Sequence, residues 1–130
     1  MPHHQQLTLT GRLRSIRFAV RGVRTMIRSQ QNAWIHAAAT AGVVALALFL
    51  RLSAPEWCWI VLAIVSVWTA EALNTALEFL TDVASPTFHP VAGKAKDVAV
   101  GAVLLSALGA VVIGLLVLGP HLAKAFVPLN

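Results

Sequence analysis

The sequence has little charge and almost no cysteine. Only 12% of its 130 residues are charged, whereas 58% are hydrophobic. A soluble domain is about 25% charged and about 45–50% apolar. This composition excludes an ordinary soluble domain, because too few polar residues remain to cover its surface. The single cysteine excludes an intrachain disulfide. Cys58 lies between two tryptophans and is interpreted as a small apolar residue, not as a nucleophile.

Acidic residues are also scarce, at five against ten basic residues, for a net charge of +5. The excess does not indicate nucleic acid, because six of the ten basic residues lie within 12–28, beside an apolar segment. A cluster in that place meets anionic lipid headgroups and sets membrane topology. We therefore expect a bilayer, and no nucleic acid, as partner. No signal peptide is recognisable, because no short apolar stretch precedes a small-residue cleavage site.

Residues 12–31 have a helical pattern with one basic face. Five arginines recur at steps of three and four and fall within about an 80° sector, with apolar residues opposite. They are Arg14, Arg17, Arg21, Arg24 and Arg28. The pattern predicts an amphipathic helix lying in the membrane interface. A cytoplasmic helix packed on other protein is the alternative.

Three apolar segments follow, each close to the roughly 20 residues that span a bilayer. They cover residues 33–50, 57–83 and 98–119. A short turn at 52–56 separates the first two, and two prolines exclude regular helix in the stretch 84–90. We expect Gly119-Pro120 to end the third segment.

The fold class predicted is therefore an all-α membrane protein with an N-terminal interfacial helix and three transmembrane helices. We divide the chain into a cytoplasmic tail and interfacial helix (1–32), a three-helix membrane domain (33–119) and a C-terminal tail (120–130). Basic residues flank one side of the spans, so the N-terminus and the 84–97 loop are expected in the cytoplasm. The expected location is the bacterial inner membrane.

The second apolar segment carries a stripe of carboxyl groups. Glu71, Glu78 and Asp82 are seven and four residues apart, so they fall within about 40° of one another on a helix. Thr75 lies near this stripe and Asn74 on its shoulder. Aligned carboxyls repel one another and are costly to bury. Folding alone gives no reason for the stripe, so a cation must offset it.

Mg²⁺ suits such a stripe, because it is held by one or two carboxylates together with substrate phosphates. Phosphoryl transfer needs this metal, a cation on the phosphates and a base near the attacking hydroxyl. Lys96 and Asp97, where the third segment begins, face the same membrane surface. Two other interpretations remain open. Glu71 can serve as the intramembrane carrier of a proton-coupled transporter, and Asp82 and Asp97 can be simple helix-end charges.

These residues resemble the prokaryotic diacylglycerol kinase family. The run Glu71-Ala-Leu-Asn74-Thr-Ala-Leu-Glu78, with Asp82 four residues on, is similar to that family's signature. A second match is Ala95-Lys96-Asp97, similar to the Ala-Lys-Asp motif that opens the family's last helix. The resemblance covers about residues 12–118 without a gap. It implies an ATP- and Mg²⁺-dependent lipid kinase, assembled as a homotrimer with active sites at the subunit boundaries.

The resemblance also implies roles for individual residues. Glu71 would be the base that takes the proton from the lipid hydroxyl, and Asn74 would position the reacting groups. Glu78 would bind metal and nucleotide phosphate. The other nucleotide contacts implied are Lys96, Asp97, Asp82, Arg17 and Arg21.

One position departs from the family pattern. Gln30 stands where many members have a glutamate that acts as a second metal ligand. Its amide oxygen binds Mg²⁺ more weakly than a carboxylate, so a degenerate, non-catalytic member is a further alternative. The family phosphorylates diacylglycerol or undecaprenol. The spacing of Ser29, Asn32, Ile35 and His36, and the pair His89-Pro90, resemble the undecaprenol branch.

Overall fold

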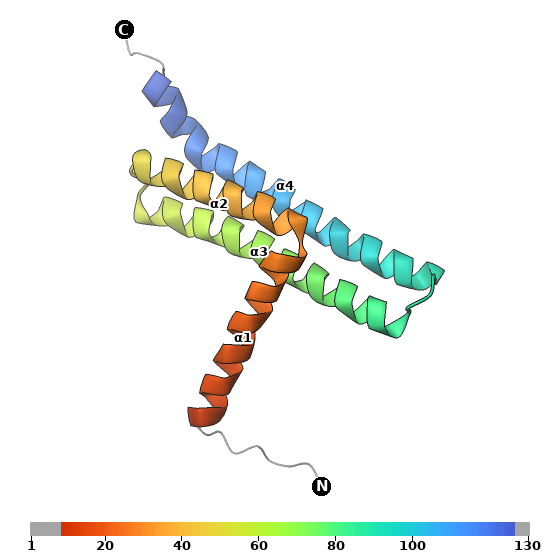
Figure 1. Cartoon of the computed structure of the whole chain (residues 1–130). Helices are drawn as coiled ribbons and strands as arrows, with labels where there is room; N and C mark the ends of the chain where they lie inside the picture. The colour runs from red at the N-terminus through yellow and green to blue at the C-terminus, as the bar shows by residue number, and fades with distance from the viewer. Residues whose placement is uncertain (1–8, 127–130) are drawn as a thin grey trace.

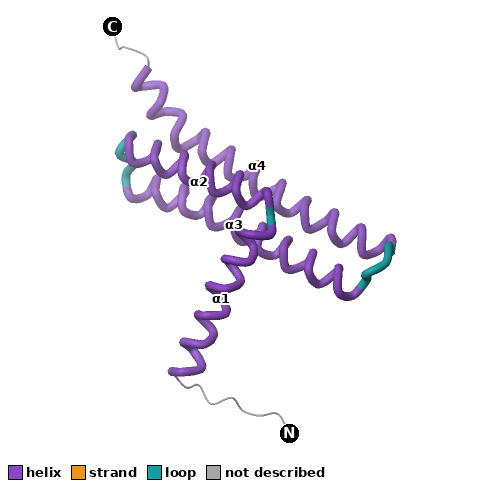
Figure 2. Tube along the Cα trace, viewed as in Figure 1, coloured by secondary structure: helices purple, strands orange, loops and turns teal. Residues whose placement is uncertain are grey.

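The computed structural model describes residues 9–126, which form four helices (Figure 1). They are α1 (Leu9–Ser29), α2 (Gln31–Phe49), α3 (Ala54–Ala84) and α4 (Pro90–Phe126). The described part of the chain contains no strand (Figure 2). The prediction of an all-α membrane protein is confirmed, with one amphipathic helix preceding three apolar ones.

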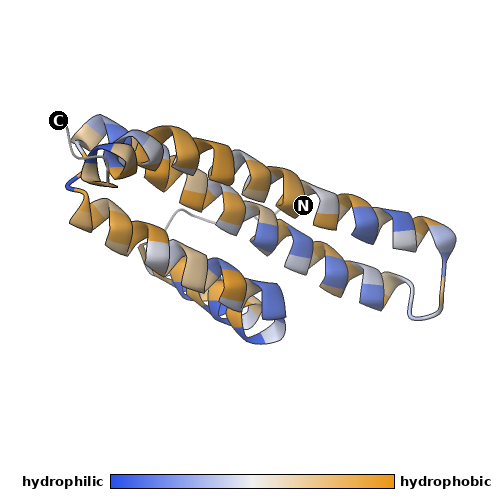
Figure 3. Cartoon of the chain, turned by 90° about the horizontal axis from the view of Figure 1, so that it is seen from above, coloured by the Kyte–Doolittle hydropathy of each residue, from blue (hydrophilic) through white to orange (hydrophobic). Residues whose placement is uncertain are grey.

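Helices α2, α3 and α4 are each long and apolar enough to cross a membrane. They run side by side, and the middle of the bundle is strongly hydrophobic (Figure 3). At 1.5 Å per residue, the 31 residues of α3 extend about 46 Å and the 37 residues of α4 about 55 Å. Both exceed a hydrocarbon core of roughly 30 Å. The α3–α4 hairpin therefore reaches beyond the apolar region, and its end is polar.

Helix α1 leaves the bundle at a steep angle (Figure 1). Met26, near its C-terminal end, is its one buried residue, and its arginines and most of its apolar side chains are exposed. An exposed helix with one basic and one apolar face suits the boundary between headgroups and hydrocarbon. The expectation of an interfacial helix agrees with this geometry, whereas packing along the bundle does not.

The connections follow from local chemistry. At the start of α3, the backbone N–H and hydroxyl of Ser53 both donate to Glu56, at 2.8 and 2.6 Å. The bond to Glu56 satisfies the backbone N–H of Ser53, which has no acceptor within the helix. The break between α3 and α4 is limited to residues 85–89. Pro90 opens α4, where its missing N–H costs nothing. Two boundaries therefore differ from the prediction, since the loop is shorter than 84–97 and the third span begins before Val98.

The expected stop at Gly119-Pro120 is wrong, because α4 continues through Pro120 to Phe126. Tertiary contacts outweigh the proline. Leu118 is buried in a cluster with Leu52 and Ile60, and Leu122 packs against it. His121 Nε2 lies 2.7 Å from Glu56 Oε1, which ties the extension to the start of α3. Residues 127–130 of the predicted tail lie outside the described part.

Candidate functional site

Burial changes steadily along the acidic stripe of α3. Glu71 is fully buried, and Asn74 and Thr75 beside it are 4% and 3% exposed. Glu78 is half-buried, and the Asp82 side chain is 64% exposed. The helical spacing predicted this common face. The structure adds that one end of the stripe lies inside the bundle and the other end at the surface.

Glu71 occupies an almost apolar environment. Neither carboxylate oxygen has a hydrogen-bond partner among the described residues. His36 on α2 lies close to this carboxylate, with Nε2 3.7 Å from Glu71 Oε2. The hydroxyl of Thr75 donates to the Glu71 backbone carbonyl at 2.9 Å, so it does not reach the carboxylate. Buried polar atoms without partners are uncommon in folded proteins, and here they mark a position suited to a substrate.

Glu78 lies one helical turn beyond Asn74, and its carboxylate accepts hydrogen bonds from two side-chain amides. Gln30 Nε2 donates to Glu78 Oε2 at 2.5 Å, and Asn74 Nδ2 donates to Glu78 Oε1 at 3.3 Å. Gln30 reaches α3 because it occupies the extended break between α1 and α2, with φ −113° and ψ 123°. The buried Asn74 Oδ1 is left without a partner. The structure thus brings together the two residues predicted to hold metal, Glu78 and Gln30.

The side chains of this cluster are of the kind that binds Mg²⁺ in proteins. Within residues 9–126, no three Asp, Glu, His or Cys side chains gather as a complete metal-binding set. Mg²⁺ does not need such a set, because it takes one or two carboxylates and completes its shell with phosphate and water oxygens. The Glu78 carboxylate, the free Asn74 Oδ1 and the Gln30 amide oxygen are hard donors of the kind required.

The outer end of the stripe forms an ion pair across the α3–α4 hairpin. Lys96 Nζ lies 2.5 Å from Asp82 Oδ1, and both side chains remain substantially exposed. Asp97, the next residue on α4, is exposed, and no described residue pairs with it. The predicted nucleotide contacts Asp82 and Lys96 are therefore adjacent, with Asp97 beside them.

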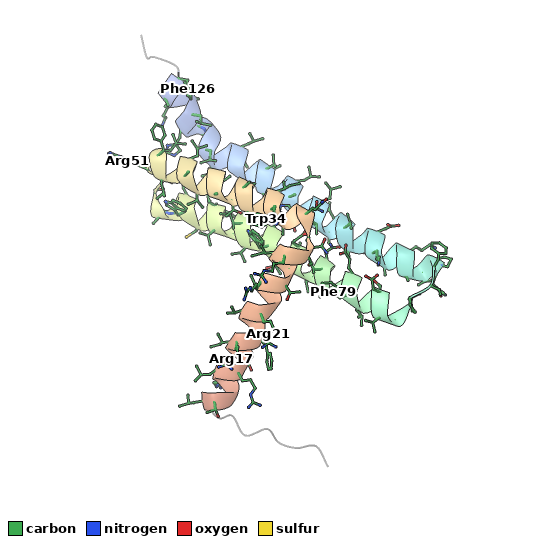
Figure 4. The ribbon with its side chains drawn as sticks, in the orientation of Figure 1. Arg17, Arg21, Trp34, Arg51, Phe79 and Phe126 are labelled. Carbon is green, nitrogen blue, oxygen red and sulfur yellow. The ribbon has the colours of Figure 1, made fainter. Side chains whose placement is uncertain are left out.

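The remaining predicted contacts, Arg17 and Arg21, do not join this group. Both are exposed on α1, and Figure 4 shows them along that helix, away from the hairpin. Arg21 Cζ lies 5.7 Å from the centre of the Phe18 ring. No ion pair links either arginine to a carboxylate within the described residues.

Sequence reasoning missed the contact between His36 and Glu71. In the sequence, His36 stands out only through its resemblance to the undecaprenol branch. Its place within the first span marks it as an unusual polar residue. Its contact with Glu71, 35 residues away, cannot be predicted from that, because it depends on how α2 and α3 pack. His36 also borders an apolar groove of about 210 Å³ between α2, α3 and α4, with Thr40, Val67 and Ala107 among the other lining residues.

The sequence is similar to those of proteins that are named as lipid kinases. Residues 17–118 match the prokaryotic diacylglycerol kinase family. An undecaprenol kinase of Bacillus subtilis is 39% identical over 104 residues, covering 80% of this chain and 85% of that protein. A diacylglycerol kinase of Synechocystis sp. is 38% identical over 114 residues, covering 87% of this chain and 65% of that protein. The chain therefore belongs to the prokaryotic diacylglycerol kinase family and is a membrane lipid kinase.

Proposed function

We propose that this chain transfers the γ-phosphate of ATP, with Mg²⁺, to the hydroxyl of a membrane lipid, and that undecaprenol is favoured over diacylglycerol. The observation that carries the proposal is the burial gradient from Glu71 to Asp82. A lipid hydroxyl approaches from the apolar end of this stripe, and a nucleotide approaches from the water-exposed end. The reaction plane then lies between them.

Glu71 is the proposed base. Its two unpartnered oxygens lie inside the bundle, where a lipid hydroxyl has access and bulk water does not. As the hydroxyl oxygen bonds to the γ-phosphorus, its proton passes to the Glu71 carboxylate and the bond to ADP breaks. Positioning and charge supply most of the catalysis in phosphoryl transfer. A small protein suffices because the bilayer already confines the acceptor near this plane.

Glu78, Asn74 and Gln30 are the proposed holders of Mg²⁺ and of the phosphates. Glu78 is seven residues beyond Glu71, which is about 10 Å along the helix. This separation leaves room for a phosphoryl group between the two carboxylates. Bound Mg²⁺ would neutralise charge on the phosphate oxygens. Asn74 lies between the two glutamates and is proposed to orient the reacting groups, since its Oδ1 is buried and free.

Lys96, Asp97 and Asp82 are proposed to contact the nucleotide at the outer end of the stripe, where the two aspartates are exposed and Lys96 is partly exposed. Arg17 and Arg21 on α1 are proposed as additional phosphate or headgroup contacts. We place this end and the N-terminus on the cytoplasmic side of the bacterial inner membrane, in accordance with the basic residues there. We further propose a homotrimer, which the resemblance implies.

The choice of acceptor rests on a few residues near the start of α2 and before α4. The relatives include one kinase named for each lipid, at nearly equal identity. The preference for undecaprenol comes from Ser29, Asn32, Ile35 and His36 and from His89-Pro90. His36 is the informative member, because it borders both Glu71 and the apolar groove.

The test is transfer of labelled γ-phosphate from ATP by the purified protein, in parallel micelles containing undecaprenol or diacylglycerol. We expect Mg²⁺-dependent label in both lipids, with at least about tenfold higher kcat/KM for undecaprenol, a difference of about 1.4 kcal/mol. A reversed preference would reassign the acceptor. No label in either lipid from folded protein would overturn the proposal and favour proton-coupled transport through Glu71 or a non-catalytic member.

A further inference from the structure

The Glu71 carboxylate has one nearby partner. Among the described residues, the imidazole of His36 is the only basic group within 4 Å of it. Taking a carboxylate out of water costs several kcal/mol unless a partner offsets the loss. A base must nevertheless be ionised before it can accept a proton. The protein therefore needs a group that favours the carboxylate form of Glu71, and His36 occupies that place.

The His36 ring is itself held in place by α2 and α3. It packs edge-on against Trp68 of α3, with ring centres 6.5 Å apart and planes inclined by 66°. Trp68 is fixed in turn, because its Nε1–H donates to the Thr40 hydroxyl at 3.1 Å. Thr40 lies one turn beyond His36 on α2. The His36 ring therefore lies against a tryptophan whose own position is fixed by a hydrogen bond.

The two oxygens of Glu71 are not equivalent. Oε2 lies 3.7 Å from His36 Nε2, whereas no described basic group lies within 4 Å of Oε1, and neither oxygen accepts a hydrogen bond from a described residue. The terminal torsion of a glutamate is soft, so an unrestrained carboxylate rotates over a broad range. An imidazole N–H that moved from 3.7 Å into hydrogen-bond distance of one oxygen would remove this freedom and leave the other oxygen available.

We propose that His36 is a positioning residue for Glu71, with its Nε2 holding Oε2 so that Oε1 is directed to the lipid hydroxyl. This inference rests on the proposed function, because it takes Glu71 as the base. The proton of the lipid hydroxyl goes to Oε1, and His36 keeps its own proton throughout the transfer step.

A second role for His36 has to be separated from this one. Its ring also borders the groove between α2, α3 and α4, so it can contact the lipid directly. A lipid contact that is equal in ground and transition states changes KM, whereas misplacement of the base changes kcat. The two roles therefore predict different kinetics.

The experiment compares His36→Phe with His36→Gln in the labelled-phosphate assay. Phenylalanine keeps a ring against Trp68 but has no N–H, and glutamine keeps an N–H donor but has no ring. We expect His36→Phe to lower kcat by about 100-fold, the usual effect of misplacing a reacting group by about an ångström. KM values for ATP and lipid should remain within roughly threefold. We expect His36→Gln to recover at least about a tenth of the wild-type kcat.

Two further variants complete the design. Thr40→Val removes the hydrogen bond that fixes Trp68 but leaves the His36 N–H in place, so its kcat should fall in the same direction as that of His36→Phe, by less than about fivefold. His36→Phe should add little to the loss caused by Glu71→Gln, because residues that act as a unit are non-additive.

An unchanged kcat in folded His36→Phe would overturn the inference, and so would a change confined to the KM for lipid. Independent, multiplying effects of His36→Phe and Glu71→Gln would overturn it as well. If His36→Phe does not fold, the inference would instead be overturned by a folded His36→Gln with less than a hundredth of the wild-type kcat. Failure of the proposed function is distinct, since the wild-type protein would then label no lipid.

Discussion

At the scale of single residues, the amide of Gln30 beside the Glu78 carboxylate sets the expected metal affinity. A second carboxylate in this place would repel Glu78 until a cation binds between them. We therefore expect Gln30→Glu to lower the Mg²⁺ concentration for half-maximal activity by roughly tenfold, or about 1.4 kcal/mol. Magnesium titrations at fixed ATP measure this directly.

The neighbouring residue supplies the control. Gln31→Glu adds the same charge one position away, on an exposed side chain at the start of α2. General attraction of cations to the surface would affect both variants equally. If the two variants require the same Mg²⁺ concentration, position 30 does not ligate metal, and the second ligand must be sought elsewhere.

Individual residues differ in how far the sequence reveals their roles. The common face of Glu71, Glu78 and Asp82 could be predicted, because it depends only on the 3.6-residue period of one helix. The contact of His36 with Glu71 could not, because it depends on the crossing of α2 and α3. The pairing of Lys96 with Asp82 likewise required the turn of the α3–α4 hairpin.

At the scale of elements, the α4 extension shows a proline tolerated inside a helix. Proline costs about 3 kcal/mol relative to alanine in a helix interior, because a backbone hydrogen bond is lost. We expect Pro120→Ala to raise the unfolding free energy in detergent by about 1–3 kcal/mol, with activity unchanged. Thermal or denaturant unfolding measures the gain.

Pro55 is the matched control for this substitution. It lies in the first turn of α3, where the missing N–H has no helical partner to lose. Pro55→Ala should therefore give no comparable gain. A decrease in stability for Pro120→Ala would mean that the backbone needs proline there to bring His121 to Glu56.

The number and the approximate bounds of the helices could largely be predicted from the sequence. Apolar length predicted the three spans, arginine spacing predicted α1, and the two prolines predicted the break before α4. The end of α4 was misjudged because a local stop signal competes with long-range packing. Leu118 and His121 contact parts of the chain about 60 residues away, and no local pattern contains that information.

At the scale of the whole molecule, one chain does not bring all the proposed groups to one point. Lys96 contacts Asp82, which is eleven residues beyond Glu71 and therefore about 16 Å from it along α3. Arg17 and Arg21 extend along α1 in another direction (Figure 4). A base and a phosphate-binding lysine that serve the same γ-phosphate must lie closer together. A site that takes Glu71 from one subunit and Lys96 from its neighbour resolves this difficulty.

Mixing two inactive variants tests this arrangement. Glu71→Gln and Lys96→Ala should each lower lipid phosphorylation to a small fraction of the wild-type rate when expressed alone. If the proposed trimer is cyclic and the two variant chains mix at random, about a quarter of its subunit boundaries unite an intact Glu71 with an intact Lys96 from the neighbouring subunit. We therefore expect co-expression to restore roughly a quarter of the wild-type activity, and separately purified variants mixed without subunit exchange to restore none. If co-expressed chains stay inactive although they co-purify, both residues serve the site from the same subunit. The hairpin would then have to bend toward Glu71 when nucleotide binds.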